Sequence, residues 1–253
     1  MRIGHTILSL PVTTSTMDDV DRHAQGGATE GLVVVADEQT AGQGRAGRSW
    51  SAPAGSALLC SILLRPSLPP NRLSTLPLVA GVAVAEAIED CAPVSCRLKW
   101  PNDVWIDGRK VAGLLMKATT SVRSVDRVVL GIGINLTARS EDLAPGATSI
   151  WAASGVVIER SSLLDALLSR LQTQYDRFVD ADGRPDLTPW RNRAALLDQM
   201  VTVEDAATRI GGRLHGVDDD GALLIDVAGE LRRIVAGDLT RGPVPEPPGP
   251  ASD

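Results

Sequence analysis

A strand that runs directly into a glycine-rich loop, and out of it into a second strand, most strongly constrains the fold of this chain. The β-branched run GLVVVADEQ (31–39) predicts a buried strand, and AGQGRAGRSW (41–50) follows at once. The next apolar run, GSALLCSILLRP (55–66), predicts another strand that stops at Pro66. Walker A loops and dinucleotide-binding loops lead into a helix instead, so the pattern matches neither of these nucleotide-binding motifs.

The rest of the chain up to about residue 199 mixes predicted strands with two long helices. The Asp107-Gly108 pair between two apolar runs indicates a tight hairpin. Ser161 and Ser162 precede an amphipathic stretch and are expected to cap the second helix. The predicted helices span 72–90, despite Pro77, and 163–179, and the further strands lie within 96–100, 104–119 and 126–137.

The pattern of apolar and turn-forming residues changes after about residue 199. Short strand-like runs alternate with GG, DDDG, AG and AGD, which is typical of a small β-barrel of about 45 residues. The last twelve residues, GPVPEPPGPASD, hold five prolines and predict a disordered tail.

Charge and composition restrict the partners that the chain can bind. Its net charge is −6, which argues against broad binding to a nucleic-acid backbone and favours small anions held in a local basic pocket. Three cysteines without metal-ligand spacing predict a reduced, cytoplasmic protein, and no metal-ligating set is assigned. No apolar run approaches the roughly 20 residues that span a bilayer, and no secretory signal is recognised.

The glycine loop itself is a candidate anion site. Gly42, Gly44 and Gly47 allow close approach of the backbone to a ligand, and Arg45 and Arg48 add positive charge. The same composition also fits a mobile surface loop, and the spacing alone does not decide between the two.

A second candidate constellation is KWPNDVWIDGRKVAG, residues 99–113. It joins Lys99, Asp103 and Lys110 in one strand, turn and hairpin, with Asn102 in the turn. Such lysines could stabilise charge that develops on a phosphate or acyl oxygen, and Asp103 could orient an attacking amine or accept its proton. Solvated lysines and ordinary turn-forming residues would give the same pattern.

A third candidate is GIGIN (131–135) within a predicted strand. Gly131 and Gly133 lie on the same face of that strand and leave it bare, so a flat ligand could lie against the backbone. Gly113 would do the same on a neighbouring strand. Close packing of a strand against a helix is the alternative explanation.

In this order and spacing, GQGRAGR, KWPNDVWIDGRKVAGLL and GIGINL resemble the biotin–protein ligases. The STM at 15–17 is similar to the family's S-T-N, and the resemblance runs from about residue 9 to 241. It implies an α+β fold of the class II aminoacyl-tRNA synthetase/biotin ligase type, with a mixed sheet flanked by helices and a small SH3-like β-barrel. The expected domains are a catalytic domain at 1–198, the barrel at 199–241 and the tail at 242–253.

The resemblance implies a ligase that uses ATP and Mg²⁺ to convert biotin to biotinyl-5′-AMP. The biotinyl group then passes to one lysine of a biotin carboxyl carrier protein or domain, and a sheet-edge homodimer occurs in the family. The implied catalytic residues are Lys110, Arg45, Asp103 and Arg48. The implied biotin-binding residues are Ser15, Thr16, Gln39, Gly42, Gln43, Arg45, Lys110, Gly113, Gly131 and Gly133. The implied nucleotide-binding residues are Arg45, Arg48, Trp50, Asn102, Lys110 and Asn135.

Two departures and two alternatives accompany this interpretation. Gln43 stands where the family's G-R-G-R-x-G-R has its first arginine, and Met17 replaces the usual asparagine. A lipoate or octanoate ligase shares the architecture, although GRAGR beside KWPND favours biotin. A non-catalytic biotin sensor is disfavoured by the intact Arg45, Arg48, Asp103 and Lys110. Only 14 residues precede STM, so a DNA-binding domain and a role as a repressor are not expected.

Overall fold

A seven-stranded mixed sheet forms the larger part of the molecule. The computed structural model describes residues 2–204 and 208–242. Strand order is β1-β2-β3-β7-β6-β5-β4, with β1 parallel to β2 and every other neighbouring pair antiparallel. The strands are β1 (Thr6–Thr13), β2 (Leu32–Gln39), β3 (Ala57–Leu64), β4 (Cys96–Lys99), β5 (Asp103–Ile106), β6 (Arg109–Thr120) and β7 (Val125–Asn135).

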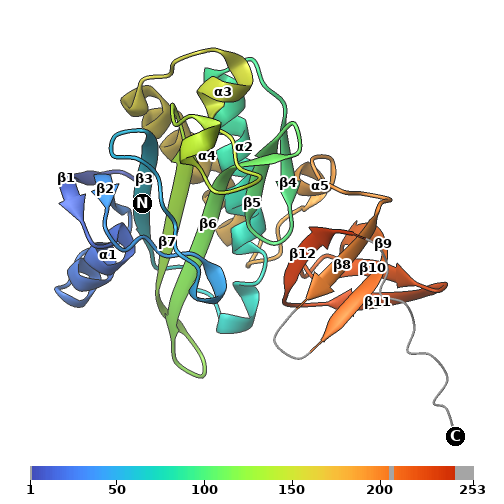
Figure 1. Cartoon of the computed structure of the whole chain (residues 1–253). Coiled ribbons are helices and arrows are strands. Elements are labelled where there is room, and N and C mark those ends of the chain that lie inside the picture. The colour runs from blue at the N-terminus through green and yellow to red at the C-terminus, as the bar shows by residue number, and fades with distance from the viewer. Residues whose placement is uncertain (1, 205–207, 243–253) are drawn as a thin grey trace, which may run out of the picture.

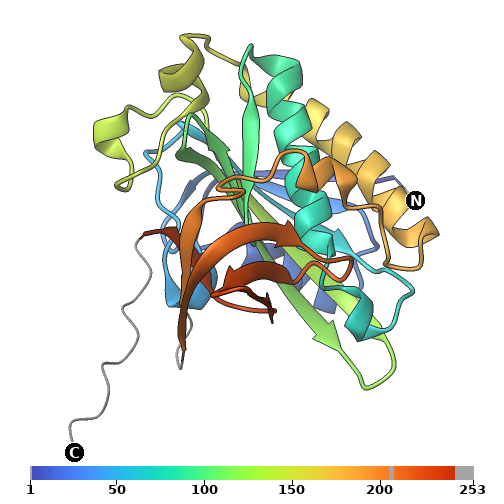
Figure 2. The ribbon, with the colours of Figure 1, turned by 90° about the vertical axis from the view of Figure 1, so that its right-hand side faces the viewer.

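Helices cover both faces of this sheet. The long helices α2 and α4 lie side by side on one face, as Figure 2 shows, and their buried side chains belong to the main apolar core. The shorter α1 lies on the opposite face over β2, β3 and β7, where Met17, Val20 and Ala24 form a smaller core. The helices are α1 (Thr16–Gln25), α2 (Leu76–Cys91), α3 (Ile150–Ser154), α4 (Arg160–Asp180) and α5 (Thr188–Arg191), and 3₁₀ turns occur at η1 (Arg45–Gly47), η2 (Pro70–Arg72) and η3 (Ser140–Asp142).

Central strands follow the predicted pattern because burial on both faces demands continuous apolar sequence. Every residue of β3 is buried. The predicted hairpin joins β5 to β6, and Asp107 and Gly108 both have positive φ, at 48° and 74°, as a type I′ turn requires. The mixed α+β architecture expected from the resemblance is confirmed.

Two helix starts differ from prediction. α2 begins at Leu76 rather than at 72, because Pro77 is tolerated only in the first turn of a helix. α4 begins at Arg160 with Glu159 as its N-cap, so the predicted serine cap was wrong. Arg160 forms an ion pair with Asp37 at 2.5 Å, which holds the chain in position at the start of the helix.

The sequence did not predict β1 or α1. β1 is an edge strand with largely exposed residues and contains Pro11, which an edge strand tolerates and a central strand does not. α1 is mostly polar, and its buried apolar residues are confined to the stripe formed by Met17, Val20 and Ala24. Neither segment therefore has the long buried apolar run that marks the central strands β2, β3 and β7.

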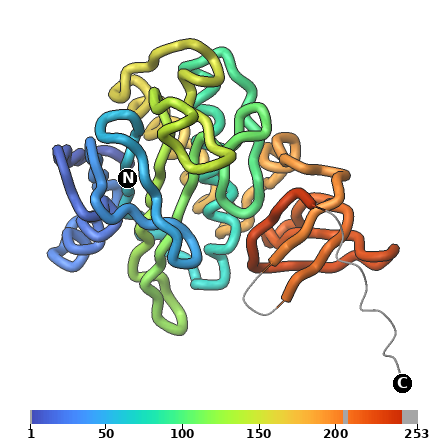
Figure 3. Tube along the Cα trace, viewed as in Figure 1, coloured from blue at the N-terminus to red at the C-terminus, as the bar shows by residue number. Residues whose placement is uncertain are grey.

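A second sheet, from the C-terminal part of the chain, lies beyond the β4 side of the first, as Figures 1 and 3 show. Among the described residues this sheet is antiparallel, with strand order β11-β10-β9-β8-β12. It is an open sheet rather than the closed barrel that was predicted. Trp100 Nε1 donates a hydrogen bond of 3.0 Å to the Gly221 carbonyl and joins the β4–β5 turn to this sheet. Its strands are β8 (Met200–Glu204), β9 (Arg209–Val217), β10 (Leu223–Val227), β11 (Glu230–Ile234) and β12 (Asp238–Arg241). Except for Gly242, the predicted tail lies outside the described residues.

Tyr175 on α4 links the helical layer to the loop before β2. Its buried hydroxyl donates to Glu30 Oε1 at 2.6 Å, and the same oxygen accepts from the Arg65 backbone N–H. Burial raises the Tyr175 pKa, so the phenol remains a donor. We expect Tyr175→Phe to lower the free energy of unfolding by about 1 kcal/mol in urea titrations. Thr173→Ala, on the exposed side of α4, serves as the control, and equal losses in both variants would contradict the assignment.

Within the described part of the chain, no helix combines the length and apolar character needed to cross a membrane.

Candidate active site

A cavity of about 410 Å³ opens where the loop after β2, the β4–β5 turn, β6, β7 and β12 meet. Apart from Gly42, all of the residues predicted for the site line it: Ser15, Thr16, Gln39, Gln43, Arg45, Arg48, Trp50, Asn102, Asp103, Lys110, Gly113, Gly131, Gly133 and Asn135. Gly42 lies at the base of the loop, where its carbonyl accepts the Trp50 backbone N–H at 2.9 Å. The three sequence constellations therefore form one site.

The glycine loop folds back on itself as a compact turn at the edge of this cavity. Gly44 N donates to the Arg48 carbonyl at 2.7 Å, and Gln43 pairs with Ser49 in a short antiparallel bridge. Between them, Ala46 and Gly47 adopt positive φ values of 52° and 74°. Glycine at position 47 meets this requirement without strain, and the turn brings both arginines of the loop to the same side.

Both loop arginines contact the C-terminal sheet. Arg48 Nη2 lies 2.9 Å from Asp238 Oδ1, and Arg45 Nη1 lies 3.5 Å from the same oxygen. Arg45 also donates to Asn102 Oδ1 at 3.4 Å. Asp238 is the first residue of β12, so the second sheet supplies a side chain to the site. These pairs hold the loop arginines over the cavity.

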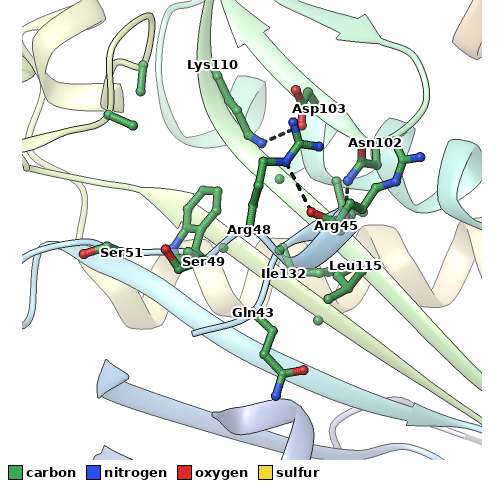
Figure 4. Close-up of a pocket in the computed structure, with 18 of the residues that line it drawn as sticks. Gln43, Arg45, Arg48, Ser49, Ser51, Asn102, Asp103, Lys110, Leu115 and Ile132 are labelled. Atoms are coloured by element: carbon green, nitrogen blue, oxygen red, sulfur yellow. Dashed lines mark hydrogen bonds and ion pairs between the residues drawn. The ribbon is translucent and has the colours of Figure 1, made fainter. Parts of the chain in front are cut away.

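Asp103 lies between two lysines. Lys110 Nζ is 2.6 Å from Asp103 Oδ1 (Figure 4), and Lys99 Nζ is 3.8 Å from Oδ2. Antiparallel pairing places Lys99 of β4 opposite Asp103 of β5, and Asp103 lies opposite Gly113 of β6, the strand that also carries Lys110. Burial lowers the Lys99 pKa, and Asp103 opposes this effect. Four lining cations face two carboxylates, so the cavity has an excess of positive charge although the chain is negative.

Trp50 covers the glycine floor of the cavity. A Cβ at Gly133 would lie 2.7 Å from Trp50 Cζ2, and one at Gly113 would lie 3.0 Å from Cζ3. A Cβ at Gly131 would lie 2.7 Å from Met17 Sδ. The strand face is bare, but the indole and the thioether occupy the space that was expected to receive a flat ligand. Trp50 therefore lies over the glycines rather than only toward a nucleotide end.

Three buried polar atoms lining this cavity have no hydrogen-bond partner among the described residues: Ser15 Oγ, Trp50 Nε1 and Asn135 Oδ1. Ser15 is the N-cap residue of α1, yet its hydroxyl makes no capping hydrogen bond. Asn135 Nδ2 is used, since it donates to the Thr148 carbonyl at 2.9 Å. An unpaired buried polar atom is costly, so these atoms indicate a ligand that carries polar groups.

A polar cluster adjoins Ser15 at the α1 end. The Thr16 backbone N–H and hydroxyl donate to Gln39 Oε1 at 2.8 and 3.0 Å. The Thr16 hydroxyl also lies 2.8 Å from Ser61 Oγ. The predicted trio of Ser15, Thr16 and Gln39 is thus assembled with the Gln39 carbonyl oxygen already occupied. Ser61, which sequence reasoning missed, completes it from β3.

Other lining residues had no recognisable signal in the sequence. Asp238 reaches the cavity only because β12 folds against the glycine loop, and residues 143–145 and 147 reach it through a loop that follows β7. Cys60 also lines the cavity, but burial raises its pKa to about 12. It therefore remains a thiol at neutral pH and does not supply a thiolate nucleophile.

Comparison with known proteins identifies two matching family models. The first, described as the biotin/lipoate A/B protein ligase family, matches residues 9–135. The second, described as the biotin protein ligase C terminal domain, matches residues 196–239. Together they cover most of both sheets.

Individual relatives and a solved structure agree with these models. The biotin--[acetyl-CoA-carboxylase] ligase of Mycobacterium tuberculosis is 32% identical over 89% of this chain and 85% of its own length. The bifunctional ligase/repressor BirA of Bacillus subtilis is 31% identical over 95% of this chain and 75% of its own length. The biotin protein ligase of Aquifex aeolicus in complex with biotin and ATP is 29% identical, with a TM-score of 0.81 over 94% of this chain and 100% of that chain.

Proposed function

The chain belongs to the biotin/lipoate A/B protein ligase family, and we propose that its cavity activates biotin with ATP and transfers it to a protein lysine. One observation carries this proposal. The cavity places the two arginines of the glycine loop beside the bare strand face, and its lining includes three buried polar atoms that have no hydrogen-bond partner among the described residues. Biotin has an anionic carboxylate and a polar bicycle, and ATP supplies a second anion. The loop arginines suit the two anions, and the bare strand face with its neighbouring unpaired polar atoms suits the biotin bicycle.

For biotin, we propose that the ureido group binds at the α1 end of the cavity. Ser15 Oγ is unpaired there, beside Thr16 and Gln39, and hydrogen bonds to these three residues would fix the orientation of the ureido group. The bicycle would rest on the floor formed by Gly113, Gly131 and Gly133 once Trp50 and Met17 make room, with Trp50 closing against it. Gly42 would act by holding the base of the loop. The carboxylate then points toward Arg45 and Lys110.

For ATP, we propose that Arg48 and Arg45 hold the phosphates, while Trp50, Asn102 and Asn135 line the nucleotide side. Asn135 Oδ1 is buried and unpaired, so it can accept a hydrogen bond from the adenine amino group. No group of three or more ligating side chains occurs among the described residues. One or two carboxylates with substrate phosphates are enough for Mg²⁺, and Asp103 could complete such a set. Bound Mg²⁺ would neutralise charge on the phosphates.

Adenylation requires two anions to approach each other. A biotin carboxylate oxygen attacks the α-phosphorus, a new C–O–P bond forms, and pyrophosphate leaves with its electron pair. Lys110 and Arg45 stabilise the charge that develops on the oxygens, because fixed cations need no reorganisation as the charge forms. The product is a mixed anhydride, and the loop from Gly42 to Arg48 would shield it from water.

Transfer requires a neutral lysine amine from the acceptor. The amine is mostly protonated at neutral pH, since its pKa is about 10.4. Asp103 is close to Lys110 and would attract and orient the incoming ammonium, with orientation as its main role. The ammonium would lose a proton to solvent, and the neutral amine would attack the acyl carbon. The acyl C–O bond would break as AMP leaves with its electron pair, and the nitrogen would give up its second proton to complete the amide.

Four further assignments are also proposals. The acceptor is a biotin carboxyl carrier protein or domain, and the enzyme works in the cytoplasm, where ATP is supplied. Residues 1–198 would form the catalytic domain and 199–241 the C-terminal domain, which the separate sheets support. Two copies would pair through β1, an edge strand on which Ile7 and Val12 are 40% and 54% exposed.

Biotin-dependent exchange between ATP and pyrophosphate tests the proposed activity. We expect exchange with biotin and little with lipoate or octanoate, because the α1 end presents hydrogen-bonding groups for a ureido ring. Exchange with lipoate alone would assign a lipoate ligase instead. Binding of biotin without exchange for either acid would assign a sensor.

A further inference from the structure

Gln43 does not direct its amide toward the reacting end of the cavity. Figure 4 shows its side chain pointing away from Asp103 and Lys110, toward the helix that the contacts identify as α1. Its Nε2 donates to both carboxylate oxygens of Asp18, at 3.0 and 2.9 Å. Its Oε1 accepts a hydrogen bond from Lys117 Nζ. The residue that stands in place of a loop arginine thus joins the loop to α1 and to β6.

Asp18 and Lys117 belong to a row of acidic and basic side chains between α1 and the sheet. Next to Asp18 on the same helix surface, Asp21 accepts from Arg127 of β7 at 2.7 Å. Arg127, followed by smaller contributions that include Lys117, lowers the Asp21 pKa, so this carboxylate is charged at neutral pH. Gln43 inserts its amide into a row of alternating acidic and basic side chains.

A neutral amide suits this position better than either charge. Its N–H group faces a carboxylate and its carbonyl faces an ammonium, so both ends are satisfied together. Arginine at position 43 would pair with Asp18 but would have no acceptor for Lys117 and would repel it. Glutamate would accept from Lys117 but would repel Asp18.

The other contacts of the loop have a different character. Arg45 and Arg48 bind Asp238, and an anionic ligand at these arginines competes with that carboxylate. The Gln43 contacts involve no cation of the loop and are unaffected by such competition. One end of the loop is therefore fixed while the other can exchange partners.

We propose that Gln43, Asp18 and Lys117 form a clamp that anchors the start of the glycine loop, so that the loop closes over its ligand by moving from Gly44 onward. Gln43 is a positioning residue, and the proposal rests on the proposed function for the identity of that ligand, biotinyl-5′-AMP. An arginine at position 43 could bind the ligand directly. The clamp instead holds the two remaining loop arginines, Arg45 and Arg48, in place.

Release of biotinyl-5′-AMP and tryptic cleavage after Arg45 and Arg48 test the clamp. We expect Gln43→Ala to increase both rates by roughly three- to tenfold, as for loss of a few exposed hydrogen bonds to charged groups. Gln43→Glu should do the same. Adding Asp18→Asn to Gln43→Glu restores a donor opposite the new carboxylate and should return both rates to within about twofold of the unmodified protein.

Gln25→Ala provides a matched control, since Gln25 donates to Asp21 at 2.6 Å on the same helix without touching the loop. It should leave both rates unchanged. Unaltered rates in Gln43→Ala, or no recovery in the double variant, would overturn the clamp. Cleavage is measured without ligand, so it tests the clamp even if the unmodified protein forms no adenylate. Absence of that adenylate would count against the proposed function alone.

Discussion

Replacing Lys110 with alanine should lower biotin-dependent ATP–pyrophosphate exchange by about two to three orders of magnitude, the range for removal of one fixed group that stabilises developing charge. Lys110 Nζ lies beside Asp103 and 5.5 Å from the centre of the Trp50 ring, at the junction of the proposed biotin and phosphate positions. Without it, Lys99 remains near Asp103 but at 3.8 Å, too far to take over the same geometry.

The same substitution should hardly change stability. The Lys110 side chain is 34% exposed, and Lys99 still faces Asp103 after the substitution, so that carboxylate keeps a cationic partner and the free energy of unfolding should change little. Arg109→Ala is the matched control, because Arg109 precedes Lys110 in β6 but is exposed and outside the cavity lining. Exchange within tenfold of the unmodified protein in Lys110→Ala would remove this residue from the catalytic set.

Gly133→Ala should weaken biotin binding by about 10- to 100-fold, which corresponds to ~1–3 kcal/mol of overpacking. The added methyl would overlap the Trp50 indole and project into the cavity from a central strand that cannot shift easily. Isothermal titration with biotin measures the effect. Melting temperature should change far less, because Trp50 belongs to the loop and can move away.

Gly131→Ala provides the comparison within the same strand. Its methyl would meet the end of the flexible Met17 side chain rather than a ring, so the loss of affinity should be smaller. If both alanine variants lose affinity equally, the steric role assigned to the indole is wrong. If neither loses affinity, the glycine floor is not the biotin site.

Local sequence predicted those parts of the site that depend only on neighbouring residues in the chain. The strand into the glycine loop, the Asp107-Gly108 turn and the paired glycines of β7 each follow from rules that act over a few positions. Their assembly into one cavity required the resemblance to a family, because register between β4, β5 and β6 sets which side chains meet.

Other features could not be predicted because they depend on contacts between distant segments. Asp238 has no catalytic pattern around it, and only the folding of β12 brings it to Arg48. The position of Trp50 over Gly133 depends on the conformation of a loop, which composition does not determine. The partners of Gln43 lie on α1, which was not predicted, and on β6.

The contact between Arg48 and Asp238 has a consequence for synthesis of the protein. The two residues are separated by 190 positions, so a growing chain presents its glycine loop long before the carboxylate that neutralises it exists. Trp100 likewise meets Gly221 only after a further 121 residues. A ribosome-bound chain that ends before β12 would lack the carboxylate that pairs with both loop arginines and the part of the cavity lining that β12 supplies. Activity should therefore appear only after β12 has been synthesised.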